Sequence, residues 1–240
     1  MKVQAEVRRP AAAGVAVLKT SLIDYPGRVS AVLFLAGCNF RCPYCHNPDL
    51  VLPPFPHDLG SLEDAVAFLD TRRSVLSGVV LSGGEPLLRD DLPDLADEVR
   101  SRGFKVKLDT NGSFPERIEA VGADFIALDL KTAPESYDRV APGIPDAGAR
   151  VLDSLKVVRS LGVPYELRIT CAPGVAELED IRELAELLVP EDSVALQGFR
   201  PLRVLDPRWE SFPATPEWLL EEYARELRTR AARVRIRSSI

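Results

Sequence analysis

Three cysteines that lie close together constrain the fold and chemistry of this chain more than any other feature. Cys38, Cys42 and Cys45 lie in the run Gly37-Cys-Asn-Phe-Arg-Cys-Pro-Tyr-Cys-His-Asn47. The preceding apolar segment, Val29 to Ala36, predicts a buried strand that delivers the first thiol from its end. Thiolates held close together bind zinc, copper(I) or an iron–sulfur cluster. The sequence therefore predicts a metal centre in this loop.

The fourth ligand that a structural zinc site requires is not obvious. The remaining candidates are Cys171, far along the chain, His46, next to the last clustered thiol, and His57. A zinc site completed by His46 or His57 is one interpretation, and a few buried thiols that bind nothing is another. An iron–sulfur cubane held by three thiolates instead leaves one iron open to a small molecule, which is our hypothesis. Cys171 lies in an apolar predicted strand, so its simplest interpretation is a buried, inert thiol.

The composition describes an ordinary globular chain. It has 240 residues, of which 46% are hydrophobic and 28% charged, and the length predicts one domain or a domain with a small appendage. The formal net charge is −6, and no dense basic block is present. General binding to nucleic acids or to anionic membranes therefore has little electrostatic support.

The cysteine content and the N-terminus bear on the cellular compartment. Four cysteines, three of them clustered with metal-ligand spacing, argue against a disulfide framework, so we expect a reducing compartment, the cytoplasm. Arg8-Arg9 before the run Ala11 to Leu18 faintly resembles a twin-arginine export signal, but Pro10 interrupts it and Lys19 ends it. We interpret this segment as a leading strand with a frayed tail. No apolar run has the length of a membrane-spanning helix.

Predicted strands and helices alternate along the chain. Val, Leu and Ile runs predict strands at 29–36, 78–81, 104–108, 125–128, 165–170 and 193–197, with a possible last strand at 234–237. Amphipathic segments predict helices at 61–69, 92–101, 115–121, 149–161, 178–188 and 216–230. Ser61 is the expected N-cap of the first helix, and Thr215 that of the last, with Pro216 at its first position. About six strand-then-helix units predict an α/β fold with a parallel sheet and outer helices.

The positions of unusual polar residues decide between a barrel and an open doubly wound sheet. They lie at or near the carboxyl ends of successive predicted strands, and they are Cys38, Gly83, Gly84, Glu85, Asp109, Asn111, Asp129, Lys131, Arg168 and Arg200. A barrel gathers all such ends around one mouth, whereas an open sheet unites only those beside its switch point. We therefore predict a partial (β/α)6 barrel.

The CX3CX2C spacing, with Tyr44 before its third cysteine, resembles the signature of the radical S-adenosylmethionine (SAM) superfamily. The additional string Thr20-Ser-Leu-Ile-Asp-Tyr-Pro-Gly27 resembles its glycyl-radical-enzyme activases, most closely those of anaerobic ribonucleoside-triphosphate reductases. The resemblance covers Thr20 to about Pro201. It implies a single radical SAM domain over 1–240, with an N-terminal extension and leading strand at 1–19, a core at 20–201, and a C-terminal helix and possible last strand at 202–240.

The resemblance also implies which residues bind SAM. Gly83-Gly84-Glu85 resembles the motif whose bare backbone approaches the methionyl amine, although a tight turn without a ligand is an alternative. Asp129-Leu-Lys131 matches a family motif that contacts SAM, the lysine reaching its carboxylate; a solvated ion pair is the alternative.

Asp109-Thr-Asn-Gly112 also matches the activases. In that family an aspartate pair near the sulfonium can hold a monovalent cation, so Asp109 and Asp129 are the candidates, with backbone groups of Thr110 and Ala127. Turn capping by Asp109 and Asn111 competes with these roles.

Four further residues complete the expected cofactor site. Arg168 and Arg200 suit carboxylate recognition, although pyruvate formate-lyase activases place a histidine near the position of Arg200. Tyr44 is expected to pack by the cluster with its backbone near adenine, or to be a plain core aromatic. His46 is a cofactor-site candidate with a structural role as its alternative.

The implied activity is that of an oxidoreductase. A [4Fe-4S] cluster with one open iron would cleave SAM reductively, and the resulting 5′-deoxyadenosyl radical would install a glycyl radical on a partner enzyme. The cofactor carries this anaerobic chemistry, so no further catalytic side chain is expected. The implied partners are an anaerobic ribonucleotide reductase and an electron donor such as flavodoxin or ferredoxin. The alternatives are a pyruvate formate-lyase-type activase, a radical SAM enzyme for a small molecule such as a modified-base precursor, and a non-catalytic metal-binding module.

Overall fold

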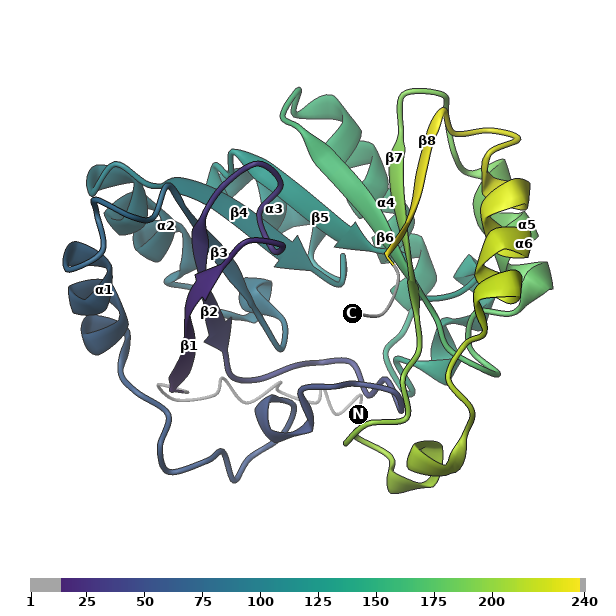
Figure 1. The fold of residues 1–240 in the computed structure, drawn as a ribbon, viewed down its shortest axis with the longest axis horizontal. Coiled ribbons are helices and arrows are strands. Elements are labelled where there is room, and N and C mark those ends of the chain that lie inside the picture. Colours follow the sequence, from purple (N-terminus) through teal and green to yellow (C-terminus); the bar gives the residue numbers. More distant parts are fainter. Residues whose placement is uncertain (1–13, 238–240) are drawn as a thin grey trace, which may run out of the picture.

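The computed structural model describes residues 14–237, whose strands form one sheet in sequence order (Figure 1). The strands are β1 (Val15–Ser21), β2 (Ser30–Leu35), β3 (Gly78–Gly83), β4 (Lys105–Thr110), β5 (Phe125–Asp129), β6 (Tyr165–Cys171), β7 (Ser193–Gly198) and β8 (Arg233–Arg237). β1 pairs with β2 in antiparallel fashion, and every later neighbouring pair is parallel. Within the described residues β1 and β8 are the two edges, so the sheet is a barrel that does not close.

One helix follows each strand from β2 to β7, which confirms the six expected strand-and-helix units. The helices are α1 (Leu62–Asp70), α2 (Leu92–Ser101), α3 (Pro115–Ile118), α4 (Ala147–Ser160), α5 (Leu178–Glu186) and α6 (Glu217–Leu227). Figure 1 shows α1 and α2 outside one half of the curved sheet and α5 and α6 outside the other. The possible last strand is present as β8. The leading strand is present as β1, whereas Arg8-Arg9 lies outside the described residues.

Capping at the helix starts agrees with the sequence in one case and differs in another. Ser61 caps α1 in a capping box with Asp64, as its sequence pattern predicts. The expected cap of α6 is wrong, because Pro216 occupies the N-cap position. The hydroxyl of Thr215 instead accepts a hydrogen bond from the backbone N–H of Phe199 at 2.8 Å and donates one to the carbonyl of Cys171.

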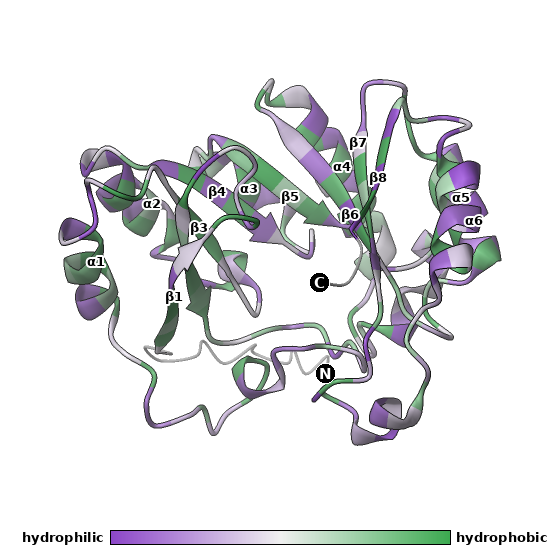
Figure 2. Cartoon of the chain, viewed as in Figure 1, coloured by the Kyte–Doolittle hydropathy of each residue, from purple (hydrophilic) through white to green (hydrophobic). Residues whose placement is uncertain are grey.

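Side-chain alternation along the strands divides the sheet into two faces. The outward face packs on the helices through residues such as Leu33, Leu81 and Leu108, which are fully buried. Figure 2 shows β2 as largely hydrophobic, while the surface helices carry both hydrophilic and hydrophobic stretches. The inward face carries the polar and charged residues of the site. None of the helices among residues 14–237 combines the length and apolar character needed to cross a membrane.

Candidate active site

A cavity of about 270 Å³ lies at the carboxyl ends of the parallel strands, and the three clustered thiols line it. Nine of the other residues expected at the site also line this cavity: Tyr44, His46, Gly83, Gly84, Asp109, Asn111, Asp129, Lys131 and Arg168. Glu85 and Arg200 do not line it. Residues from five successive strand ends therefore converge as a barrel predicts.

The cysteine loop is held by backbone contacts to distant parts of the chain. The N–H of Arg41 donates to the carbonyl of Val140 at 2.7 Å, and the N–H of Leu205 donates to the carbonyl of Cys45 at 3.1 Å. Within the loop, the Arg41 guanidinium donates to the carbonyl of Cys38 at 2.7 Å. These contacts fix the loop at its middle and at its last cysteine.

Burial keeps the clustered thiols protonated. Burial, followed by the charge of Glu85, raises the pKa of Cys38 to about 12. Burial raises the pKa of Cys42 to about 11 and also raises that of Cys45. Iron bound at the loop would supply the positive charge that stabilises thiolates, so cluster assembly would release protons. The three soft donors that line the cavity fit an iron–sulfur cluster.

The residues that a zinc site would need as a fourth ligand are engaged or distant. His46 Nε2 lies 3.1 Å from the carbonyl oxygen of Arg200, and its ring stacks on Phe199. His57 is exposed and outside the cavity, and Cys171 is buried at the end of β6, also outside it. In residues 14–237, no three His, Cys, Asp or Glu side chains are grouped tightly enough for one metal ion. A cubane attaches each thiolate to a different iron, so it does not require such a group.

Gly83, the last residue of β3, packs against the end of β2, and Gly84, which follows it, packs against the cysteine loop. A Cβ atom on Gly84 would lie 2.0 Å from the carbonyl oxygen of Gly37 and 3.2 Å from Cβ of Cys38. Gly83 has a φ of +116° and packs against the backbone of Leu35. Glycine is required at both positions because the backbone there lies against other backbone of the same chain. Gly83 and Gly84 also line the cavity.

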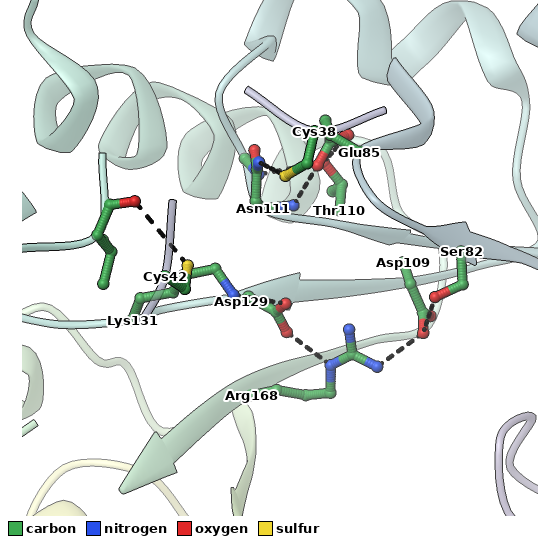
Figure 3. A network of polar contacts seen from close by, with 12 residues as sticks. Cys38, Cys42, Ser82, Glu85, Asp109, Thr110, Asn111, Asp129, Lys131 and Arg168 are labelled. Carbon is green, nitrogen blue, oxygen red and sulfur yellow. Dashed lines mark hydrogen bonds and ion pairs between the residues drawn. The ribbon is translucent and has the colours of Figure 1, made fainter. Parts of the chain in front are cut away.

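Charged side chains from three neighbouring strands form one network (Figure 3). Arg168 on β6 donates from Nε to Asp129 at 2.7 Å and from Nη1 to Asp109 at 2.7 Å. Lys131 Nζ lies 3.1 Å from the other oxygen of Asp129. The side chains of Asp129 and Lys131 are 25% and 15% exposed and line the cavity, so they are not a freely solvated ion pair.

The network sets the charge states of its members. Burial raises the pKa of Asp129, but Arg168 and Lys131 outweigh burial and lower it to about 2. Burial likewise opposes ionisation of Asp109, yet Arg168 and Lys107 hold its pKa below the usual value. Burial lowers the pKa of Lys131, but the carboxylate of Asp129 leads the charges that raise it well above the usual value. Asp109, Asp129 and Lys131 are therefore charged at neutral pH.

The turn after β4 is capped by Asn111, while Asp109 has a different role. Asn111 Oδ1 accepts hydrogen bonds from the N–H and hydroxyl of Ser113 at 2.9 and 2.6 Å. Its Nδ2 lies 4.0 Å from the sulfur of Cys38. The capping alternative therefore holds for Asn111, whereas the carboxylate of Asp109 faces Arg168 and Lys107.

Comparison with known proteins agrees with this geometry. The family model described as the radical SAM superfamily matches residues 32–188. The chain belongs to the radical SAM superfamily. It is 34% identical over 214 residues, 86% of this chain and 88% of the relative, to a Methanocaldococcus jannaschii protein named as a candidate glycyl-radical enzyme activating enzyme. It is 31% identical over 175 residues to the pyruvate formate-lyase-activating enzyme of Clostridium pasteurianum, covering 70% of this chain and 72% of that enzyme.

The fold is also shared with solved structures. The structure of TYW1 with a lysine-pyruvate adduct aligns with a TM-score of 0.61 and 16% identity, covering 85% of this chain and 73% of that chain. At this identity the likeness concerns the fold alone. Membership of the superfamily and homology to the activases identify the chain as a radical SAM enzyme with a [4Fe-4S] cluster and SAM as cofactors.

The side chain of Glu85 does not line the cavity. Its carboxylate accepts hydrogen bonds from the N–H of Leu87 at 3.0 Å, the hydroxyl of Thr110 at 2.8 Å and the N–H of Asn111 at 2.7 Å. The side chain of Glu85 thus joins two loops, and its contact with the cofactor stays a prediction. Arg200 is similarly outside the cavity, and it is its carbonyl that contacts His46.

Several lining residues were not expected from the sequence. They are the polar residues Asp24, Asn47, Ser82, Thr170 and Gln197 and the apolar residues Phe40 and Val51. Ser82 and Thr170 lie near the ends of predicted strands, which could have signalled them. Lys107 was also missed; it pairs with Asp109 beneath the cavity and is 1% exposed.

Proposed function

We propose that this radical SAM enzyme is a glycyl-radical-enzyme activase whose partner is an anaerobic ribonucleoside-triphosphate reductase. The observation that carries the proposal is that three cluster thiols and the charged network of Asp109, Asp129, Lys131 and Arg168 line one cavity. Similarity to a candidate activase over most of both chains supports the activase class. The string from Thr20 to Gly27 supports the choice of partner.

The protein holds and orients cofactors in this proposal. Cys38, Cys42 and Cys45 ligate the cluster. A bound, reduced cluster would supply the electron that cleaves SAM into methionine and the 5′-deoxyadenosyl group that would take a hydrogen atom from a glycine of the partner. Flavodoxin or ferredoxin would provide the electron. No general acid or base is required, so no catalytic side chain beyond this set is assigned.

We assign the groups of SAM to the lining residues by their chemistry. The ammonium of Lys131 suits the carboxylate, with Arg168 beside it, and the backbone of Gly83 and Gly84 suits the amine. Tyr44 suits the adenine end, because its hydroxyl is buried and has no hydrogen-bond partner among the described residues. An unsatisfied buried hydroxyl costs about 1–3 kcal/mol, which a bound ligand can recover. His46 is next to Cys45 in the sequence, and the carbonyl of Arg200 holds its ring, so we assign it a structural role.

The reaction class is tested first. The protein is reconstituted anaerobically with iron and sulfide, reduced with dithionite, and examined by low-temperature electron paramagnetic resonance with and without SAM. We expect a reduced-cluster signal that changes when SAM is added, together with 5′-deoxyadenosine. A signal that ignores SAM would contradict the assignment of an open iron.

The partner is tested next by mixing the reduced protein and SAM with the anaerobic ribonucleotide reductase of the same organism. We expect a glycyl radical on the reductase and none on its variant in which the radical glycine is replaced by alanine. A pyruvate formate-lyase-type partner is the second candidate, favoured by similarity to the Clostridium pasteurianum enzyme. A radical on that lyase alone would replace the reductase as partner. Deoxyadenosine without a radical on either protein would favour a small-molecule substrate.

A further inference from the structure

The carboxylates of Asp109 and Asp129 are connected by a protein cation. Arg168 lies between them and donates to one oxygen of each at 2.7 Å (Figure 3). Its guanidinium forms the same two contacts as ion pairs. The position between the two aspartates, where the resemblance implies a monovalent cation, is therefore taken by a side chain.

The outer oxygens of the pair are also engaged. Lys107 Nζ lies 2.5 Å from Oδ1 of Asp109, and Lys131 Nζ lies 3.1 Å from Oδ2 of Asp129. Ser82 adds a hydroxyl at 3.3 Å from Asp109. All four carboxylate oxygens thus have a cationic partner.

The net charge of the network also disfavours a bound metal cation. Two carboxylates face three cations, Lys107, Lys131 and Arg168, so the network has a formal charge of +1. Hard metal cations bind to oxygen ligands and are favoured by an excess of negative charge. The network has the opposite excess, and the residues as placed do not fit a monovalent cation.

Lys107 is the member that makes this network distinctive. It lies two residues before Asp109 on β4, so both side chains point to the inward face of the sheet. Its side chain is 1% exposed, and its ammonium lies 5.8 Å from the ring centroid of Phe125. Burying an ammonium is costly unless it is paired, and here Asp109 is the pair. Lys107 does not line the SAM cavity, so it can act on SAM only through Asp109.

We propose that Lys107 and Arg168 supply internally the charge compensation that a monovalent cation would give to Asp109 and Asp129, so that SAM binding is independent of Na⁺ and K⁺. Lys107 is then a positioning residue, which holds Asp109 and through it Arg168 in place. The proposal concerns SAM binding and does not rest on the partner proposed above.

The test measures SAM affinity in different salts. Equilibrium binding of SAM to the anaerobically reconstituted protein is compared in KCl, NaCl and tetramethylammonium chloride at equal ionic strength. For the unmodified protein we expect dissociation constants that agree within about twofold, since tetramethylammonium is too large to replace a bound cation. A gain in affinity of about tenfold in KCl, equivalent to about 1.4 kcal/mol, would overturn the proposal.

Replacing Lys107 should make SAM affinity depend on K⁺. Lys107→Ala removes the ammonium and leaves space beside Asp109, so we expect SAM affinity about tenfold weaker in tetramethylammonium chloride and partly restored by KCl. Lys105→Ala is the matched control, because Lys105 is on the same strand, is half exposed and pairs with Asp124. We expect no salt response from it.

Two further measurements keep the test decisive. K⁺ should raise the melting temperature of the cluster-free Lys107→Ala protein and leave that of the cluster-free unmodified protein unchanged, which is independent of activity. Should Lys107→Ala fail to fold, Lys107→Gln, which removes the charge and keeps a polar side chain, provides the same comparison. A folded variant whose SAM affinity is weakened but indifferent to K⁺ would contradict the substitution of protein cations for a metal cation.

Discussion

Oε2 of Glu85 accepts a hydrogen bond of 2.7 Å from the backbone N–H of Asn111, and this contact fastens the loop after β3 to the loop after β4. The side chain of Glu85 lies outside the cavity, yet this contact positions two residues that line it, Asn111 and Gly84. The carboxylate is fully buried, with an exposed fraction of 1%. Its ionisation should therefore be visible in the stability of the protein.

Glu85→Gln should flatten the pH dependence of stability. Burial raises the pKa of Glu85 from 4.5 to about 7. A raised folded-state pKa contributes stability that is present below about pH 4.5 and is lost as the pH rises through about 7. The difference of roughly 2.5 pH units corresponds to about 3 kcal/mol between pH 4.5 and 8.

The measurement is urea unfolding of the cluster-free protein at several pH values. The variant should lose this pH-dependent part and cost about 1–3 kcal/mol at pH 5, because one buried N–H loses its acceptor. Glu183→Gln, at an exposed position on α5, should change neither quantity. An unchanged pH profile in Glu85→Gln would show that this carboxyl does not titrate in the predicted range.

Alanine at any of the three clustered cysteines should abolish cluster loading. Each of Cys38, Cys42 and Cys45 lines the cavity, whereas Cys171 is buried outside it. Iron content after reconstitution should fall from about four atoms per chain to near zero in the three variants and stay unchanged in Cys171→Ala. Loss of the cluster in Cys171→Ala alone would refute the ligand assignment.

Gly84→Ala should disturb the cysteine loop. The added Cβ would lie 2.0 Å from the carbonyl oxygen of Gly37, so one of the two loops must move. We expect lower iron content and a loss of about 1–3 kcal/mol in unfolding free energy. Gly60→Ala is the control, since its Cβ would approach other atoms no closer than 3.7 Å. Equal iron content in both variants would mean that the loop tolerates the displacement.

Lys131→Met should weaken SAM binding without removing the cluster. The substitution keeps most of the side-chain volume but removes the charge that we assign to the SAM carboxylate. SAM affinity should fall at least about tenfold, while iron content stays constant. Lys156→Met, at an exposed position on α4, serves as the comparison. Unchanged affinity would remove Lys131 from the binding site.

The sequence predicted the succession of strands and helices because each strand is a short run of Val, Leu and Ile between turn residues. It located most of the cavity because a barrel brings strand ends together. It missed Lys107, since a lysine that alternates with apolar residues looks like a solvent-facing position until the barrel buries it. It placed the cap of α6 at Thr215, whose hydroxyl is taken by Phe199 and Cys171, partners that are distant in sequence.

Two residues expected at the cofactor site, Glu85 and Arg200, do not line the cavity, and their contacts explain why. Glu85 follows the glycine pair, yet its donors Thr110 and Asn111 come from the next strand, which no local pattern reveals. For Arg200, the chain uses the main-chain carbonyl rather than the guanidinium to contact His46.

The contacts of the cysteine loop also determine when it can form during protein synthesis. Strands pair with their neighbours in sequence, so the sheet can grow strand by strand as the chain leaves the ribosome. The loop, however, depends on hydrogen bonds to Val140 and Leu205, which are translated long after Cys45. The loop can therefore reach its final conformation only after almost the whole chain has been synthesised. The cluster should accordingly be inserted after translation, into a protein whose sheet and helices have already folded.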